Sequence, residues 1–488
     1  PFIGHTGSFA LGGNKMAAAF LNKVKSDAVV RVKGIGFDFA IPSGPYLIRK
    51  ALVSSNHLDW NITVSAMLGK LFGGSKRLCD AIKVDNSGIS PNPYPGSQVH
   101  PGRRMGRNQH IFFNDAFSKK SMDEIVPRFV ANLYLQCLSF SIGTRWVEMD
   151  DLFSFVYDLA FPCAVKSFYG ESILKINPGL QANFLAFENY APFLASGMPT
   201  WLKPNAMRVR SKCHTAMKKW RADAMRRSVE DPESESAAWD PAWGLGALRR
   251  RNKLREATDG LYDEDAHAAS DLATIWAFTT NVIPASFWFL FEILNSKQLL
   301  ERARTDIESS KTATGSIDPT KMVNAPLLQS IYAEVLRLHT ASLLSRTSKQ
   351  EHRLDGWIIP KSQAVMISTQ VEHRSQYWNT VDSNTGTHHP PSAFFAERFL
   401  VKDESGNEKF SLDGKQGRWI PYGMGEHMCP GRNFAKFEMM LVFAVVMDKF
   451  EIELRSPEGW TPDDDLKRYG FGALMPKQKV GFRIRERV

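Results

Sequence analysis

One stretch, residues 420–434, constrains this chain more than any other; it reads IPYGMGEHMCPGRNF. Glycines lie on both sides of Cys429, and an apolar pattern with helical spacing begins directly after them. Glycine has no Cβ, so it permits positive φ and lets a backbone approach a flat ligand closely. Pro430 suits the first turn of a helix, where its missing N–H has no cost. Cys429 would therefore lie at the positive end of a helix, which favours the thiolate over the thiol.

A lone thiolate on a glycine-rich loop is one of the ways in which proteins ligate haem iron. The alternative is a loop around a buried, inert cysteine, which is what most free cysteines are. The loop by itself leaves both interpretations open. Motifs further upstream in the chain favour the first.

Three motifs, in the expected order, resemble those of the cytochrome P450 superfamily. Residues 422–431 resemble its haem-binding signature, with Tyr422 in place of the usual first Phe. Residues 334–337 resemble its Glu-x-x-Arg pair, and residues 394–399 resemble its aromatic-x-Pro-Glu-Arg-Phe segment, with Ala396 in place of the Pro. A Glu-x-x-Arg pair alone is a weak signal, because surface helices often carry such pairs. The three motifs together are a strong one, and the resemblance runs over essentially the whole chain.

The resemblance implies the cytochrome P450 fold, which is mostly α with a minor β region and holds haem between a long central helix and the helix after the cysteine loop. On length alone, 488 residues suggest about three domains. No Gly/Ser-rich linker or internal repeat divides the sequence, so we expect a single catalytic domain over residues 1–488, and a monomer. Five scattered cysteines, an odd number, argue against a disulfide framework.

The net charge of +10 has three interpretations: binding to nucleic acid, to an anionic membrane surface or to an acidic protein. Basic residues crowd residues 218–227 and 249–255, but an acidic run at 230–235 separates them, which disfavours a nucleic-acid surface. Most such runs are solvated faces, and we expect that here. The resemblance implies an acidic flavoprotein, NADPH–cytochrome P450 reductase, as the partner, so that NADPH is used through the reductase and not bound directly.

The chain begins at Pro1 without an initiator Met. Microsomal members of the family carry an N-terminal membrane helix before a Pro-rich hinge, so we expect an anchor before Pro1 and a place on the cytoplasmic face of the endoplasmic reticulum membrane. A helix is expected over residues 16–25, then a half-buried strand over residues 35–41, where apolar residues alternate strictly. The composition of residues 85–107, rich in Gly, Pro, Ser and Asn, predicts an irregular, mobile loop; in the family this loop covers the substrate.

Residues 271–294 form the longest apolar stretch. It could span a membrane or cross the core of a large soluble protein, and the polar residues at its middle favour the core helix. The resemblance implies the long helix across the haem, in which Thr280 and Asn281 replace the family's acid–alcohol pair and are the expected catalytic residues. Pro284 lacks an N–H, so it kinks the helix and frees the carbonyl of Thr280. The alternative for Asn281 is a satisfied polar residue at a helix crossing.

Asn281 followed by Pro284 resembles the branch of the family that holds cholesterol 7α-hydroxylase and prostacyclin synthase, so a microsomal and possibly fungal member is expected. The resemblance also implies a buried network behind the haem, made of Glu334, Arg337 and Arg398. The expected cofactor-binding residues, from the cysteine loop or within reach of a haem propionate, are Cys429, Arg346, His427, Tyr422, Gly423 and Gly431. The cofactor would be haem b, with Cys429 as the metal ligand of its iron.

The resemblance also implies which residues wall the substrate pocket, and all but one of them are apolar. They are Phe278, Val282, Ala341, Ser342, Leu343, Leu344 and Leu474. The family's Trp-x-x-x-Arg motif is missing from residues 110–177, so one propionate contact is unassigned. A tight hairpin over residues 469–476 would carry Leu474 into the pocket.

Apolar walls imply a bulky lipophilic substrate, such as a sterol, a terpenoid or a related secondary metabolite. The first hypothesis is a reductase-dependent monooxygenase that hydroxylates an unactivated carbon. The second is an isomerase or dehydratase that rearranges a peroxide or another substrate without a reductase, as prostacyclin synthase does. The third is a haem protein that binds without turnover; the apolar pocket argues against it, because electron carriers usually saturate both axial positions.

Overall fold

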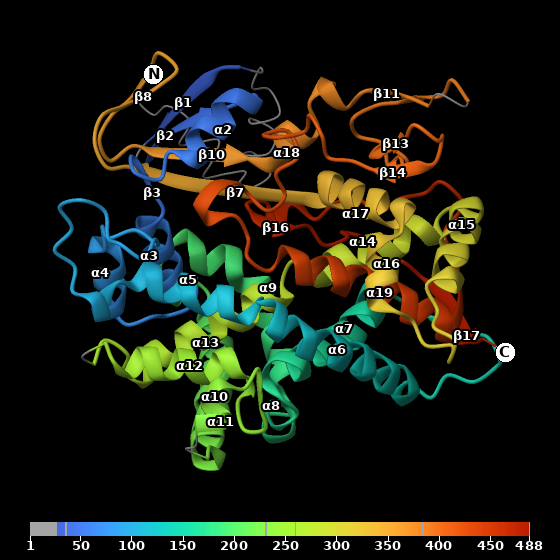
Figure 1. The fold of residues 1–488 in the computed structure, drawn as a ribbon, viewed down its shortest axis with the longest axis horizontal. Helices are drawn as coiled ribbons and strands as arrows, with labels where there is room; N and C mark the ends of the chain where they lie inside the picture. Colours follow the sequence, from blue (N-terminus) through green and yellow to red (C-terminus); the bar gives the residue numbers. More distant parts are fainter. Residues whose placement is uncertain (1–26, 35–36, 230–231, 259, 383–384, 488) are drawn as a thin grey trace. The chain divides into compact units, whose positions relative to one another are not determined.

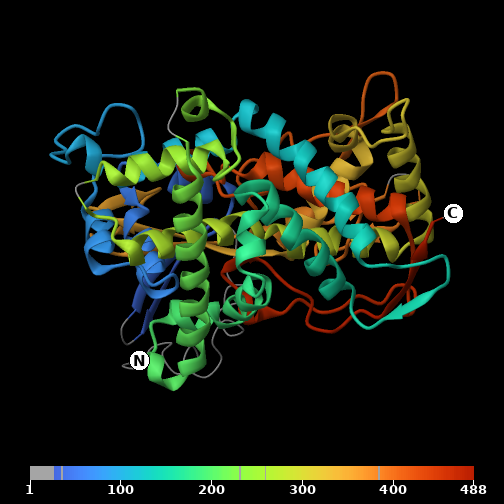
Figure 2. The same cartoon turned by 90° about the horizontal axis from the view of Figure 1, so that it is seen from below.

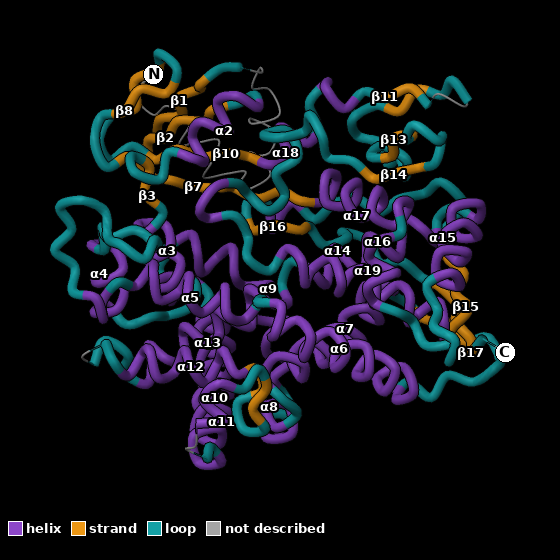
Figure 3. The backbone as a smooth tube through the Cα atoms, in the orientation of Figure 1, coloured by secondary structure: helices purple, strands orange, loops and turns teal. Residues whose placement is uncertain are grey.

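The computed structural model describes residues 27–34, 37–229, 232–258, 260–382 and 385–487. Their helices and strands form a mostly α fold with a minor β region, as the sequence predicts (Figure 3). The helix expected over residues 16–25 lies outside the described residues.

The chain folds into two compact units, each built from separate stretches of sequence. The first unit takes in Pro1–Asp59, Cys137–Asp158 and Asn281–Val488. The second takes in Trp60–Gln136 and Leu159–Thr280. The single domain expected over residues 1–488 stays a prediction.

The main sheet belongs to the first unit and contains strands from the N-terminal and the C-terminal parts of the chain. Its strands follow the order β1-β2-β10-β7-β16, and β3 also pairs with β7 (Figure 1). The strands are β1 (Val29–Gly34), β2 (Phe37–Pro42), β3 (Leu58–Asp59), β7 (Thr340–Ser348), β10 (Ala364–Ser368) and β16 (Phe471–Ala473). Only β2 and β10 run parallel among these pairs. The sheet therefore places β7, which directly follows a helix, between two antiparallel neighbours.

The strand expected over residues 35–41 is β2, which begins at Phe37. Phe39 and Ile41 lie in one buried cluster, as their alternation predicts. The other face is mixed, because Ala40 lies in a second cluster with residues of α2 (Pro45–Val53) and β10, whereas the Asp38 side chain is 32% exposed. The expectation of a half-buried strand therefore holds at Asp38 and fails at Ala40, and Ile35 lies outside the described residues.

Four longer helices of the first unit surround the segments that bear the motifs. They are α14 (Val282–Leu294), α15 (Lys297–Ser309), α17 (Pro326–His339) and α19 (Arg432–Lys449). Proline at the first turn starts α17, where a missing N–H leaves no helical bond unmade. The helix α19 begins directly after the cysteine loop, and residues 438–447 are all buried. It packs against α14 and α17, which explains why residues 439–447 are apolar on every face of the helix.

The long apolar stretch is helical and begins earlier than expected. Residues 264–294 pass the length and composition test for a membrane-spanning helix, and it is the single such helix among the described residues. Of the most apolar window, 83% is buried within the protein, which fits the core helix predicted from its polar centre. Asp263 caps its start by accepting the N–H of Ala266. The regular helix is interrupted between α13 (Glu264–Thr279) and α14, at Thr280 and Asn281.

The second unit is helical and includes α3 (Asn61–Lys70), α4 (Lys76–Val84), α5 (Met105–Ala116), α9 (Leu180–Ser196), α10 (Pro204–Arg227), α12 (Gly246–Glu256) and α13. In Figure 2 these helices have colours from blue to yellow-green. The helices α9 and α13 pack on α10, and α5 packs on α12. The basic run at 249–255 is not the solvated face that we expected, because Arg249, Arg251 and Arg255 are buried. Asp240 pairs with Arg249, and Asp271 pairs with Arg251 and Arg255, so buried carboxylates offset the cost of burying these cations. The number of charges in a sequence run does not reveal such pairs.

The irregular segment expected at 85–107 is irregular up to Val99 and then enters a short 3₁₀ turn and α5. Arg104 is buried beneath this loop and donates to the carbonyls of Ser90 and Pro91, both at 2.6 Å. It also donates to the Ser87 hydroxyl at 3.2 Å. A guanidinium that binds three loop positions restrains the loop, which composition alone does not reveal.

Candidate active site

The cysteine loop folds back on itself before α19. The Cys429 N–H donates to the carbonyl of Tyr422 at 2.9 Å, so the loop closes over the 3₁₀ turn Gly425–His427. Gly423 and Gly425 have φ of 71° and 74°, which favours glycine at both positions. A Cβ at Gly425 would lie 2.7 Å from the carbonyl oxygen of Leu52 in α2. The close approach that requires this glycine is therefore to the protein's own backbone.

Gly423 differs, because a Cβ there would meet only ordinary contacts, the nearest being the Leu344 side chain at 3.8 Å. This places Leu344 of β7 beside the cysteine loop. Gly431 has φ of −81°, so its backbone does not require glycine. Among the three loop glycines, left-handed geometry thus explains two.

The surroundings of Cys429 suit a metal-bound thiolate better than a free one. Burial raises the pKa of the thiol, and the backbone N–H groups of Gly431 and Arg432 together with the Arg432 charge offset this only in part. Without a cation at the sulfur the thiol would therefore be favoured, contrary to the expectation from the helix end alone. Backbone N–H groups that point at one sulfur, beside an unpaired cysteine at the start of a helix, form the donor set of a haem-thiolate ligand. The residues present fit haem iron.

Arg346 and His427 are the residues expected at the propionates. Arg346 lies on β7 with its side chain buried, and burial lowers the pKa of the guanidinium to about 10. A buried cation gains from an anionic group beside it, so Arg346 also fits the carboxylates of a haem. His427 ends the 3₁₀ turn, two residues before Cys429.

Tyr422, which replaces the family's usual Phe, has a defined partner. Its hydroxyl lies 2.7 Å from the hydroxyl of Tyr332 in α17, and the rings of both tyrosines contact Trp419. Burial raises the pKa of both phenols, so both stay protonated and one donates to the other. Sequence reasoning missed Tyr332; the departure from Phe at position 422 was the available signal, because a buried hydroxyl needs a partner.

Glu334, Arg337 and Arg398 lie together in the interior. Glu334 accepts from Arg337 Nε and Nη2 at 2.7 and 2.8 Å, and from Arg398 Nε at 2.9 Å. The side chains of Glu334 and Arg337 are fully buried. Arg337 also donates to the carbonyls of His373 and Pro391, both at 2.6 Å. One carboxylate faces two guanidinium groups here, and backbone carbonyls and the Thr380 hydroxyl accept from their other N–H groups.

His373 joins this network to the cysteine loop. Its Nε2 accepts the N–H of Ile420 at 2.9 Å, at the start of the loop. Burial lowers the pKa of His373 to about 3, so the ring stays neutral and keeps an acceptor nitrogen. His373 thus acts on the loop's position and takes no part as a proton donor. Sequence reasoning did not find this contact, because residues 373 and 420 are far apart in the chain.

Asn281 is held by the hairpin near the C-terminus. Its Oδ1 accepts the N–H of Ala473 in β16 at 3.0 Å. A Cβ at Gly472 would lie 2.1 Å from this oxygen, so only glycine fits, and its φ of 121° also favours glycine. The carbonyl of Asn281 accepts from Ala285 at 3.2 Å, one turn into α14. The side-chain oxygen of Asn281 therefore already accepts a hydrogen bond from the protein, and its Nδ2 group remains as a donor.

Thr280 is buried, and its hydroxyl has no hydrogen-bond partner among the described residues. The backbone N–H of Thr280 still donates to Trp276 at 3.1 Å, so the helix is intact before it. Pro284 offers no N–H to the Thr280 carbonyl, one turn earlier. A buried hydroxyl and a freed carbonyl at one residue require a further polar group.

The residues expected to wall the pocket lie in three places. Ala341 and Leu474 lie in the buried cluster with Val32 and Phe39 and pack against the sheet. Ser342, Leu343 and Leu344 are half-buried along β7, and Val282 is buried at the start of α14. Phe278 belongs to the other unit, where its ring stacks on Phe168 at a centroid distance of 3.9 Å. Their role as substrate contacts stays a prediction.

A comparison with protein families and with known proteins agrees with this geometry. The family model "Cytochrome P450" matches residues 100–482. The chain is 30% identical to cytochrome P450 monooxygenase efuG of Hormonema carpetanum, over 100% of this chain and 88% of that protein. It is 34% identical to cytochrome P450 monooxygenase fsoE of Humicola fuscoatra, over 78% and 70% of the two chains. It is 27% identical to cholesterol 7-alpha-monooxygenase of Cricetulus griseus, over 71% and 68%.

Two independent lines therefore converge on one family. The cysteine loop offers a single sulfur ligand with backbone donors around it. The family match covers this loop, the Glu334 network and the central helix. The chain belongs to the cytochrome P450 family and is a cytochrome P450 monooxygenase.

Proposed function

We propose that this monooxygenase oxidises an unactivated carbon of a bulky lipophilic substrate, a sterol, a terpenoid or a related secondary metabolite. O2 is the oxidant, and NADPH supplies electrons through a cytochrome P450 reductase. The observation that carries this proposal is the cysteine loop, in which the backbone N–H groups of Gly431 and Arg432 face the Cys429 sulfur just before α19. Relatives with cholesterol and cholestane in their printed names support a steroid-like substrate.

Haem b would be the cofactor, with Cys429 as the residue that holds its iron, and when bound it would supply the iron at which O2 is activated. Arg346 and His427 hold its propionates, and charge-assisted hydrogen bonds suit this role. Tyr422, Gly423 and Gly431 shape the loop that carries the sulfur. The Tyr422–Tyr332 pair and the bond from Ile420 to His373 fix this loop from two sides.

Glu334, Arg337 and Arg398 set the position of α17 against the segment before the cysteine loop. A buried charge network is better evidence for a fixed geometry than for stability. Through His373, whose carbonyl accepts from Arg337, the network reaches Ile420. These residues position the sulfur and do not touch the substrate.

Thr280 and Asn281 handle the proton that the reaction needs. Neither side chain ionises, so neither is a proton reservoir. The Thr280 hydroxyl can donate and accept, and Asn281 Nδ2 can donate, because Oδ1 is occupied by Ala473. Water held at the freed Thr280 carbonyl would then be the proton source, and the two side chains orient it.

The test is the mass of the product formed under heavy-isotope oxygen gas. The haem-loaded protein is incubated with reductase, NADPH and a panel of sterols and terpenoids, with a reductase-free control. One heavy oxygen in the product, and only with reductase, supports the proposal. The matched variants are Cys429→Ser, which removes the axial sulfur and should abolish turnover, and Cys79→Ser, which exchanges a half-buried cysteine outside the site and should keep it.

The second candidate is an isomerase or dehydratase that needs no reductase. The observation that favours it is that Thr280 and Asn281 leave the central helix without a carboxylic acid at the two positions of the usual acid–alcohol pair. An unlabelled isomer or dehydrated product, formed equally with and without reductase, would establish this candidate and overturn the first.

We further propose a monomer that is anchored on the cytoplasmic face of the endoplasmic reticulum membrane and docks the reductase. Its net charge of +10 suits an acidic flavoprotein. A salt titration tests the docking, because rising ionic strength should slow reductase-driven turnover. An unchanged rate would contradict an electrostatic interface. Fractionation of cells that express the gene tests the location, since recovery in the soluble fraction would contradict it.

A further inference from the structure

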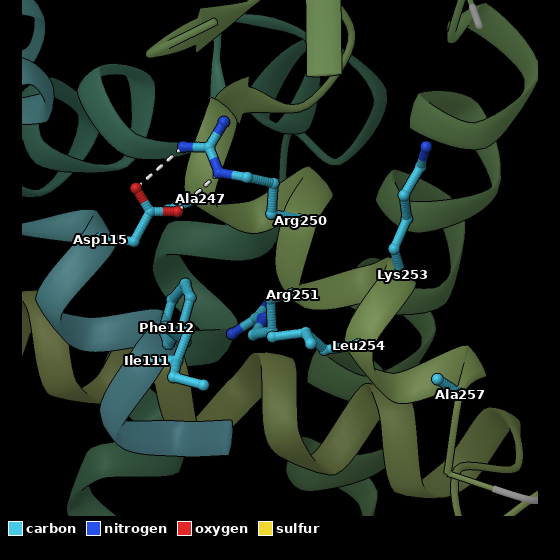
Figure 4. A pocket seen from close by; sticks show the side chains of 9 residues that line it. All are labelled: Ile111, Phe112, Asp115, Ala247, Arg250, Arg251, Lys253, Leu254 and Ala257. Atoms are coloured by element: carbon cyan, nitrogen blue, oxygen red, sulfur yellow. Dashed lines mark hydrogen bonds and ion pairs between the residues drawn. The ribbon is translucent and has the colours of Figure 1, made fainter. Parts of the chain in front are cut away.

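A pocket of about 400 Å³ lies between α5 and α12 of the second unit, where it is lined by residues of these two helices and by Ala257 just after α12. Five lining residues are apolar: Ile111, Phe112, Ala247, Leu254 and Ala257. The four others are charged: Asp115, Arg250, Arg251 and Lys253 (Figure 4). The surface of the pocket is thus almost wholly apolar, and the charged groups of the four other residues lie at or beneath its walls.

Two of the three basic residues have a carboxylate partner that they do not share with another cation. Arg250 and Asp115 form two parallel bonds, of 2.7 and 2.9 Å, which Figure 4 shows as dashed lines. Lys253 pairs with Glu235, and both side chains are about half exposed. The exposed Lys253–Glu235 pair contributes little. Arg250 and Asp115 are only 31% and 29% exposed, and their bidentate pair is of the stronger kind. They leave no demand for a further ligand.

Arg251 is different, because it is buried and shares its carboxylate. Its side chain is 8% exposed, and Figure 4 shows it reaching toward Phe112, whose ring lies 4.4 Å from the guanidinium carbon. Arg251 Nη2 donates to Asp271 Oδ1 at 2.7 Å, and Arg255 Nη1 donates to the same oxygen at 2.6 Å. Two buried guanidinium groups therefore face one carboxylate.

The other titratable groups around this cluster do not restore the balance. Burial, helped by Arg255, lowers the pKa of His267 to about 3, so its ring is neutral. Burial also raises the pKa of Tyr169, so its phenol keeps its proton. Burial and then Arg255 lower the pKa of Arg251 to about 10, which is still charged at neutral pH. The cluster carries one surplus positive charge in the interior, which is costly without an anion.

A second observation points to where the anion would bind. Arg251 Nε is buried and has no hydrogen-bond partner among the described residues, whereas its Nη1 donates to Thr274 at 2.5 Å. Arg251 lines the pocket. An unmet donor on a surplus cation, beside an apolar hollow, has the features that recognise a carboxylate with an apolar tail.

We propose that this pocket binds an amphipathic monocarboxylate, a fatty acid or an isoprenoid acid, with its carboxylate at Arg251 and its tail along Ile111, Phe112 and Leu254. The bound acid neutralises the surplus charge of the Arg251, Arg255 and Asp271 cluster. The site lies within one unit and contains neither the cysteine loop nor Asn281, so the proposal does not rest on the oxidation chemistry.

The test is isothermal titration calorimetry of the haem-loaded protein with decanoate, decan-1-ol and inorganic phosphate. Decanoate should bind with one-to-one stoichiometry and at least tenfold more tightly than decan-1-ol, because only decanoate carries the charge. Phosphate alone should not bind. Equal affinities for decanoate and decan-1-ol, or binding of phosphate as tight as that of decanoate, would overturn the amphipathic-acid proposal.

Two variants locate the binding. Arg251→Gln should lower decanoate affinity at least tenfold, whereas Arg208→Gln, the same exchange at an exposed arginine of α10, should change it less than twofold. Ala257→Trp should also weaken binding at least tenfold, because Ala257 is exposed at the pocket and the larger side chain fills it.

The melting temperature separates a ligand site from a structural role. Arg251→Gln leaves Arg255 and Asp271 as a balanced pair, so the ligand-free variant should melt no lower than the wild type, and decanoate should raise only the wild-type value. A variant that melts lower and still binds decanoate refutes the proposal. If Arg251→Gln does not fold, the decanoate affinity of Ala257→Trp is the deciding measurement. An affinity equal to that of the wild type would refute the proposal.

Discussion

Gly472→Ala offers a sharp test of how Asn281 is held. The added Cβ would lie 2.1 Å from Asn281 Oδ1 and would occupy a backbone with φ of 121°. The backbone strain costs about 1–2 kcal/mol. Displacing the amide leaves the Ala473 N–H unmatched, which costs a further ~1–3 kcal/mol. The variant should therefore lose about 2–5 kcal/mol of the free energy of unfolding.

Gly459→Ala is the matched control, because its φ is 81° and nothing lies within 4 Å of the added Cβ. It should lose only the backbone part, about 1–2 kcal/mol. The measurement is urea unfolding of the haem-loaded proteins, followed by the haem absorbance. The product formed per NADPH oxidised is recorded in parallel; it should fall in Gly472→Ala, where Asn281 is displaced, and stay unchanged in Gly459→Ala.

A double-mutant cycle isolates the contact itself. Asn281→Ala removes the oxygen that the new Cβ would strike, so the double variant should cost less than the two single variants together, by about 1–3 kcal/mol. Strict additivity would show that Gly472 and Asn281 do not meet. A wild-type stability and yield of product in Gly472→Ala would refute the whole argument.

The remaining predictions concern the loop and its supports. Arg337→Ala should cost about 3–5 kcal/mol and prevent haem incorporation, because Glu334 loses a buried partner and the buried carbonyls of His373 and Pro391 lose their donor; haem content measures this. Tyr422→Phe should cost ~1–3 kcal/mol by leaving the Tyr332 hydroxyl unmatched, as urea unfolding would show. Burial lowers the pKa of His339, but Asp464 and Glu292 outweigh it and raise the pKa. The stability from His339 is therefore complete below its unfolded pKa of about 6.5 and is lost as the pH rises through the raised value, which unfolding at a series of pH values measures.

Each of these has a result that counts against it. Normal haem content in Arg337→Ala would mean that the network does not position the cysteine loop. Adding Tyr332→Phe to Tyr422→Phe should recover most of the lost stability, because both hydroxyls are then gone, and no recovery would contradict the pairing. For the pH series, His339→Gln should lose the slope above the unfolded pKa; an unchanged slope would assign it to another group.

The parts of the site that short sequence spacing defines could be predicted. The cysteine loop and the Glu334–Arg337 pair each lie within a few residues, so local rules apply to them. The central helix was also predictable, because an apolar stretch with a polar middle indicates a core helix. Its break at Thr280 and Asn281 followed from Pro284.

The parts that long-range packing defines could not be predicted. Ala473 meets Asn281 across 192 residues, and Tyr332 meets Tyr422 across 90. No spacing rule links such positions without the fold. The need for glycine at 425 was attributed to a flat ligand, but it comes from the backbone of Leu52.

The sequence also failed to predict which charged side chains are buried. The basic run at 249–255 was expected in solvent, because charges usually are. The partner that permits the burial of Arg251 and Arg255, Asp271, lies on the apolar central stretch, where one carboxylate gave no signal of an ion pair.

The parallel pairing of β2 with β10 has a consequence for synthesis of the chain. The side chains of Asp38 and Gln363 meet beside this pair, although 325 residues separate them. A ribosome that adds 5–20 residues per second needs roughly 16–65 s to make the intervening chain. During that interval one edge of β2 has no neighbour, and an open strand edge invites pairing with other chains. The second unit, which ends at Thr280, is already complete in sequence by then, so its helices can fold while the sheet of the first unit still lacks β10. We therefore expect chaperones to bind the nascent chain mainly at the β1–β2 hairpin.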